Sequence, residues 1–288
     1  MKVDPLFASS GERPSRSDKD ISAIGHRNIG GKGLGNWYSL DQEKEMGKKL
    51  SLQVEQSSKI LDDPAITEYV ARVAENISRN SDAQMPITVR LIDSEHIEAF
   101  TLPGGHQYIT RGLLLQLENE GELASVLARG IAHTALRSST RLMTREQYAN
   151  IGTIPLVLMD GSSARLSSDT PSSGLPITFL KFKRGFETAA DYFGVQYVYK
   201  AGYSPEGFSQ IVQKIWPVSP VAGKAFNSFP PTSERLQVLQ KEIAELMPKR
   251  DGEIVSTPEF EEFRKHLRSW TPSEPVQLQG KEKPHLQE

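Results

Sequence analysis

Two neighbouring segments, EAFTLPGGHQYIT at residues 98–110 and EGELASVLARGIAHTALR at residues 120–137, indicate the fold class. The first reads as two short strands joined by a turn at Pro-Gly-Gly. The second carries apolar residues at helical spacing along one side, which predicts a long helix. Further elements are expected around this pair: helices at 39–57, 63–77, 111–117, 182–200, 205–215, 232–247 and 258–267, and a strand at 87–91. Ser39-Leu40-Asp41-Gln42 reads as a capping box at the start of the first of these helices, and Asp63-Pro64 marks the start of the second. The sequence therefore predicts the α+β class, with a mostly helical domain around one small β-sheet.

Polar segments flank the predicted domain. Residues 1–35 are rich in Ser, Gly, Arg and Lys without any period, and the segment after Trp270 is polar and contains three prolines. Such compositions are typical of chain that cannot bury a core. We therefore expect a disordered tail at 1–35, a folded domain at 36–270 and a second disordered tail at 271–288. Residues 139–178, rich in Ser, Gly and Pro, are expected to form a long surface loop with short helical pieces.

The composition of this chain of 288 residues excludes several classes of binding partner and active site. Lys and Arg total 34 against 36 Asp and Glu, giving a formal charge of −2, so no global basic field favours nucleic acid as a partner. The chain has no cysteine, which excludes disulfides, thiolate metal sites and a cysteine nucleophile. Any metal must therefore be held by His, Asp or Glu.

The helix predicted at residues 120–137 carries part of a metal-binding pattern. In a zinc peptidase helix of the form His-Glu-x-x-His, the spacing of four places both imidazoles on one face, and the glutamate polarises the zinc-bound water. Here the first position is Arg129 and the second is Gly130, and only His133 remains. A later predicted helix carries Glu187 and Asp191, which are suited to a third ligand and a carboxylate that holds a ligand. That pair alone is also common on solvated helix faces.

Several phrases, taken together and in order, resemble one protein family. They are DDPAITEYV (62–70), AFTLPGG (99–105), ITRGLL (109–114), ENEGELA (118–124) and KAGYSP (200–205). The chain is similar in these to the HtpX/BepA/Oma-like zinc metallopeptidases, the gluzincins of peptidase family M48. The resemblance covers about two thirds of the chain. It implies a gluzincin-like fold, a zinc cofactor, a polypeptide substrate or client protein and a role in protein quality control.

The resemblance also implies roles for individual residues. His133 matches the second histidine ligand, Glu187 the third ligand and Asp191 its supporting acid. Glu98, Ala99, Phe100, Thr101 and Leu102 match the edge strand that binds the substrate backbone in the family.

The same resemblance identifies positions that have lost their chemistry. Arg129 stands where the first histidine belongs, Gly130 where the general base belongs, and Phe229 where a histidine stabilises the tetrahedral intermediate. Arg235 matches a retained arginine. No catalytic set is therefore intact, and zinc is expected to bind weakly or not at all.

Two functions remain open from the sequence. In the first, the chain is a catalytically degenerate homologue that binds extended polypeptide in a retained groove, and Arg129 serves as counter-ion of Glu187, with Asp191 as a second candidate partner. In the second, it is an active zinc-dependent metalloendopeptidase with a non-standard site.

No transmembrane segment is expected, because no apolar run approaches about 20 residues. The amino terminus carries no secretory signal, which favours a cytoplasmic location as written. If the chain is truncated at that end, an extracytoplasmic or periplasmic location is expected.

Overall fold

The computed structural model describes residues 20–31, 35–149, 184–218 and 233–271. Its elements run in chain order as follows: η2 (Ile21–Ala23), α1 (Leu40–Ser57), α2 (Pro64–Arg79), β1 (Thr88–Ile92), β2 (Ala99–Leu102), η3 (Pro103–Gly105), β3 (His106–Thr110), α3 (Arg111–Gln116), α4 (Glu120–Ala135), α5 (Ser138–Ala149), α6 (Arg184–Lys200), α7 (Glu206–Val218), α9 (Ser233–Leu246) and α10 (Pro258–Ser269). This arrangement confirms the predicted α+β class and a mostly helical domain around a small sheet.

Capping residues explain where the helices begin. Ser39 and Gln42 form the capping box that was predicted at the start of α1. Asp63 caps α2 by accepting a hydrogen bond from the Ile66 amide, and Pro64 occupies the first turn, where no amide proton is needed. These local signals confirm the expected starts of both helices.

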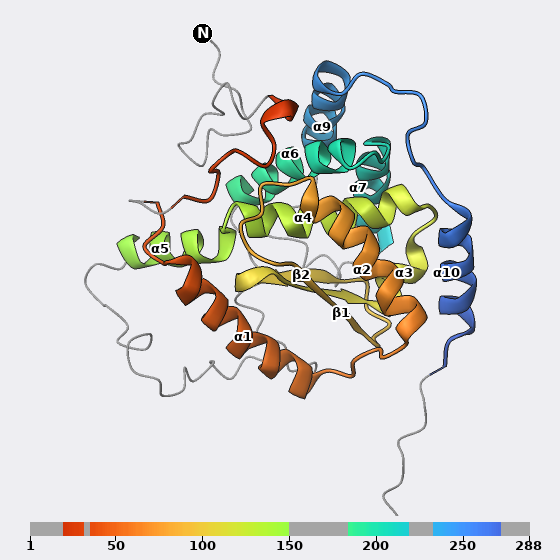
Figure 1. Ribbon diagram of the computed structural model, residues 1–288, viewed down its shortest axis with the longest axis horizontal. Helices are drawn as coiled ribbons and strands as arrows, with labels where there is room; N and C mark the ends of the chain where they lie inside the picture. The colour runs from red at the N-terminus through yellow and green to blue at the C-terminus, as the bar shows by residue number, and fades with distance from the viewer. Residues whose placement is uncertain (1–19, 32–34, 150–183, 219–232, 272–288) are drawn as a thin grey trace, which may run out of the picture.

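The sheet has three strands in the order β1-β3-β2, with β1 parallel and β2 antiparallel to β3. Helix α1 packs against β2, β3 and η3 on one side, and α4 packs against β2 on the other. Gly47 of α1 permits the contact with η3, since a Cβ there would lie 2.0 Å from the carbonyl oxygen of Pro103. The sheet therefore lies between α1 and α4 (Figure 1).

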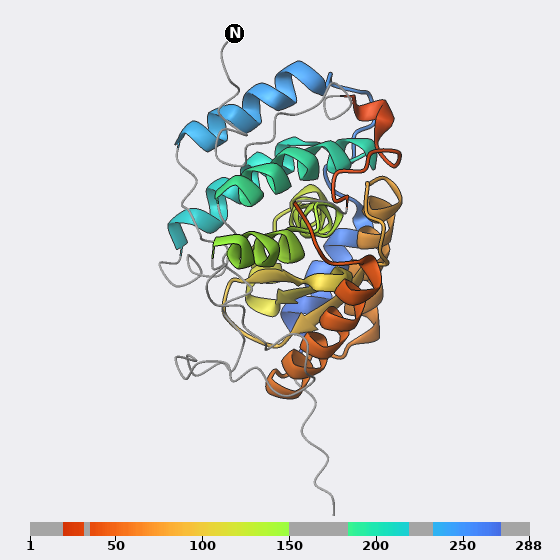
Figure 2. The same ribbon diagram turned by 90° about the vertical axis from the view of Figure 1, so that its left-hand side faces the viewer.

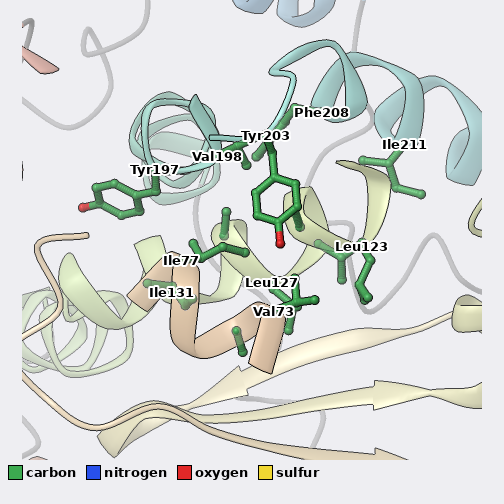
Figure 3. Close-up of a cluster of buried hydrophobic side chains, with 14 of the residues drawn as sticks. Val73, Ile77, Leu123, Leu127, Ile131, Tyr197, Val198, Tyr203, Phe208 and Ile211 are labelled. Atoms are coloured by element: carbon green, nitrogen blue, oxygen red, sulfur yellow. The ribbon is translucent and has the colours of Figure 1, made fainter. Parts of the chain in front are cut away.

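The core lies around α4. This helix packs against α2, α6 and α7, and α9 lies beyond α6 and α7 (Figures 1 and 2). Figure 3 shows the side chains that meet there, and it labels Val73, Ile77, Leu123, Leu127, Ile131, Tyr197, Val198, Tyr203, Phe208 and Ile211. Because α4 is surrounded by other elements, nearly all of its residues are buried.

Residues 20–31 were expected to belong to a disordered tail, but the structure packs them against the domain. Arg27 is buried and donates from Nε to Asp82 Oδ2 at 2.9 Å, while its Nη1 donates to Gln196. Ile24 joins the hydrophobic core. The polar composition hid this contact because the partners of Arg27 lie far along the chain. Residues 1–19, 32–34 and 272–288 of the two predicted tails fall outside the described residues.

The segment 139–178 was expected to form a surface loop with short helical pieces, and its first part is a helix whose described side chains are mostly buried. Helix α5 extends from Ser138 to Ala149, and Thr140 donates a hydrogen bond to Glu43 of α1 at 3.0 Å. Arg137, just before α5, forms a buried ion pair with the same carboxylate at 2.6 Å. These tertiary contacts override a composition that favours loops. The rest of the expected loop, 150–178, lies outside the described residues.

In the part of the chain that the structure describes, no helix combines the length and the hydropathy that crossing a bilayer requires.

Candidate functional site: a guanidinium between α4 and α6

The site is built on two helices that pack side by side, α4 and α6. Arg129 lies on α4, and Glu187 and Asp191 lie four residues apart on α6, so one face of α6 presents both carboxylates to α4. The Arg129 guanidinium donates from Nη2 to Glu187 Oε2 and from Nε to Asp191 Oδ1 at 3.1 Å. The counter-ion expected for Glu187, and considered for Asp191, is therefore present.

All three side chains of this cluster are largely withdrawn from water. The exposed fraction is 13% for Arg129, 6% for Glu187 and 5% for Asp191. Two buried carboxylates need a cation or several hydrogen bonds to remain charged. Arginine suits this role because it stays protonated and its planar fork can reach two acceptors at once.

Gly130 lies beside Arg129 and faces the sheet. Within α4, these two residues are the ones that are not fully buried. A Cβ at position 130 would lie 2.7 Å from Gln107 Cδ and 2.8 Å from Thr101 Oγ1. The sheet therefore approaches α4 closely at Gly130, where the absence of a side chain allows the contact.

His133 is buried one turn further along α4. Its Nδ1 lies 3.1 Å from the Ser138 hydroxyl at the start of α5, so one ring nitrogen makes a hydrogen bond whose direction depends on the tautomer. Ser138 is itself fully buried. The contact orients the imidazole and ties α4 to α5.

Strand β2 lies at one edge of the sheet. The bond from Thr110 N to Glu98 O marks residues 98 and 110 as a hydrogen-bonded pair of the antiparallel ladder. Such pairs alternate, so the main-chain groups of Ala99 and Thr101 point away from β3. Among the described residues, no strand pairs with that outer edge. The side chains of Phe100 and Leu102 point to the face of the sheet that α1 covers, and they pack there with Val54 of α1.

Glu98 begins the segment that was matched to a substrate-binding strand. Its amide donates to Thr110 Oγ1 at 3.0 Å, and burial raises the pKa of its carboxyl. Phe229 lies outside the described residues, and for Arg235 the structure describes the backbone in the first turn of α9 but not the side chain.

Sequence reasoning missed two residues beside the site, Gln107 and Ser138. A signal for Gln107 was present, because it shares a face of β3 with the buried Ile109 and is a polar residue on an inward face. Ser138 offered no such signal, since it becomes a neighbour of His133 only through the turn between α4 and α5.

Comparison with known proteins assigns the chain to a family. The model of Peptidase family M48 matches residues 63–243, which include β1 to β3 and the helices α4 and α6. The chain belongs to peptidase family M48. The family assignment that was inferred from the sequence is thus confirmed.

Curated M48 relatives support the same assignment. The chain is 28% identical over 193 residues to the beta-barrel assembly-enhancing protease of Yersinia pestis and 25% identical over 193 residues to that of Escherichia coli K12. In both cases 64% of this chain and 40% of the relative are covered. It is 28% identical over 225 residues to the mitochondrial metalloendopeptidase OMA1 of Schizosaccharomyces pombe, covering 75% of this chain and 65% of the relative. The chain therefore spans about 40% of the length of the first two relatives.

Zinc is the metal that M48 membership implies, and the described residues do not fit it. A zinc site in a peptidase needs three protein ligands and a water. Among the described residues, no three His, Cys, Asp or Glu side chains are grouped so that they could hold a metal ion. Instead, the Arg129 guanidinium binds the carboxylate of Glu187, the residue matched to a ligand. A fixed cation at this position opposes a second cation beside it.

Proposed function

We propose that this chain is a catalytically degenerate M48 metallopeptidase homologue that binds extended polypeptide without cleaving it. One observation carries the proposal: Arg129, at the position matched to the first zinc ligand, donates to both Glu187 and Asp191. The guanidinium supplies the positive charge that these carboxylates would otherwise receive from a metal and its ligand. The cluster then has a structural role, holding α6 against α4.

The lack of a general base also supports the absence of peptidase activity. At the position matched to the glutamate that would take the proton of the attacking water, Gly130 has no side chain. General-base catalysis typically contributes about 10²- to 10⁴-fold to a rate. The absence of this group and the missing metal ligand act together, so peptide hydrolysis by the usual metallopeptidase chemistry is not expected.

Polypeptide binding is supported by the edge of β2. The main-chain N–H and C=O groups of Ala99 and Thr101 point outward along this edge. An extended peptide adds to such an edge through main-chain hydrogen bonds. The edge lies beside Gly130, because the Thr101 side chain approaches that residue from β2. In this proposal the protein keeps strand β2 for binding polypeptide but lacks the side chains for catalysis at positions 129 and 130.

Metal analysis combined with a protease assay tests the loss of activity. Purified protein is dialysed against zinc, its metal content is measured by mass spectrometry, and casein hydrolysis is followed with and without a chelator. We expect well below one zinc per chain and no chelator-sensitive cleavage. Stoichiometric zinc together with cleavage that a chelator abolishes would instead establish the active endopeptidase.

Peptide binding is tested by substitution at the edge strand. Proline at position 99 removes an outward N–H without removing a bond to β3, so Ala99→Pro should weaken binding of fluorescent unstructured peptides at least tenfold in an anisotropy titration. Leu40→Pro is the control, because Leu40 is the first residue of α1, where proline is tolerated, and Ser39 before it is already extended. Equal affinity of the two variants would contradict strand addition at β2.

A further inference from the structure

The space in front of Gly130 is filled by side chains of the sheet. An added Cβ would lie 2.7 Å from Gln107 Cδ, 2.8 Å from Gln107 Nε2 and 2.8 Å from Thr101 Oγ1. Carbon atoms of neighbouring side chains normally approach to about 3.5–4.0 Å. A residue larger than glycine at this position therefore requires both neighbours to move.

Neither neighbour moves freely. Gln107 has an exposed fraction of only 3%, and its Nε2 donates to the Leu127 carbonyl oxygen on α4 at 3.4 Å. Displacing the amide would break this contact inside the protein, where a buried polar group without a partner is costly. Thr101 is also buried, and the antiparallel ladder between β2 and β3 fixes the position of its main chain.

We propose that Gln107 and Thr101 occupy the volume of the missing general base, so that changes on α4 alone cannot restore catalysis. This inference rests on the proposed function in one respect, the assignment of Gly130 to the general-base position. The close packing of the two side chains on Gly130 is independent of that assignment. Glycine at 130 is then required by packing. This requirement explains why α4 contains a glycine, although glycine destabilises a helix interior by about 1 kcal/mol relative to alanine.

The test compares one substitution in two backgrounds. In the parent chain, Gly130→Ala should lower the folding equilibrium constant about 5- to 150-fold, the range that overpacking typically produces. In the background T101A/Q107A, the same substitution should raise that constant, about fivefold, because the clash is relieved and alanine favours the helix. Both values come from urea denaturation followed by far-ultraviolet circular dichroism. If T101A/Q107A does not fold, Q107A alone serves as the background, and the loss should shrink at least threefold.

Gly47→Ala is the matched control. Its Cβ would meet the Pro103 carbonyl oxygen at 2.0 Å, a main-chain clash that the two sheet substitutions do not relieve. It should be equally destabilising in both backgrounds. A similar loss for Gly130→Ala in both backgrounds would overturn the inference.

A second measurement addresses the catalytic consequence. The variant R129H/G130E, with Thr101 and Gln107 intact, should remain unable to cleave casein in the presence of zinc. Chelator-sensitive cleavage by that variant would overturn the inference, because the glutamate would then have found room beside the sheet. The stability comparison involves no metal and no peptide cleavage. If only the packing inference is wrong, Gly130→Ala is equally destabilising in both backgrounds. If only the proposed function is wrong, the parent chain binds zinc and cleaves casein.

Discussion

Replacing Arg129 by methionine is expected to lower the free energy of unfolding by about 3–5 kcal/mol, the usual cost of removing one partner from a buried ion pair. Methionine keeps much of the length of arginine and removes its charge. Glu187 and Asp191 then lose the guanidinium that both of them contact.

The magnitude follows from the geometry of the cluster. At the 3.1 Å that separates Arg129 Nε from Asp191 Oδ1, two unit charges attract by about 5 kcal/mol at an effective dielectric constant of about 20. Desolvation of all three groups offsets much of the attraction, and this cost remains for the carboxylates when the cation is removed. The loss should therefore far exceed the 0–1 kcal/mol of an exposed pair.

Urea denaturation measures this prediction, with two comparison variants. Arg72→Met removes an exposed pair with Glu259 at 3.2 Å and should cost at most about 1 kcal/mol. The triple variant R129M/E187Q/D191N removes all three charges and should recover at least half of the loss, since no buried carboxylate then lacks its cation. The reasoning would be refuted if Arg129→Met cost no more than Arg72→Met, or if the triple variant were as unstable as the single one.

Three further predictions concern metal, the N-terminal segment and pH. Addition of a chelator should leave the melting temperature unchanged, because the proposed cluster is held by a guanidinium; a drop of several degrees in differential scanning fluorimetry would contradict this. Arg27→Ala should cost about 3–5 kcal/mol, because it breaks a buried pair with Asp82, and should increase amide hydrogen exchange in residues 20–31. Burial raises the pKa of Asp93, but Lys59 and Arg111 outweigh this effect and hold the pKa below its usual value. The Asp93 carboxylate therefore stabilises the fold above its unfolded-state pKa of about 3.9, and this contribution is lost as the pH falls through the lower folded-state pKa. Asp93→Asn should flatten the fall in stability on the acid side, and an unchanged slope would contradict the assignment.

Local sequence signals were sufficient where neighbouring residues decide the structure. The capping box at Ser39 and the Asp63-Pro64 start predicted the beginnings of α1 and α2. The Pro-Gly-Gly turn between two short segments predicted β2 and β3. These features depend on contacts between residues a few positions apart, so they can be read without knowledge of the fold.

The same signals failed where a distant partner decides the structure. Arg27 lies in a polar, glycine-rich stretch, yet its ion pair with Asp82 holds residues 20–31 on the domain. Thr140 lies in a segment rich in small polar residues, yet Glu43 accepts its hydrogen bond within a helix. Composition describes what a segment prefers alone, and a buried contact with a distant residue can outweigh that preference.

At the site, the sequence by itself determined which chemical groups are present: an arginine and a glycine at the positions that we matched to the histidine and the glutamate of a zinc peptidase helix. Those identities already limited metal binding, since a guanidinium donates and never ligates. Only the tertiary structure decided what the new groups do. It brought Glu187 and Asp191 of α6 to Arg129, and it brought Gln107 of the sheet against Gly130. Such pairings arise from the packing of elements that are separate in the chain, and packing complementarity is not encoded in any one segment.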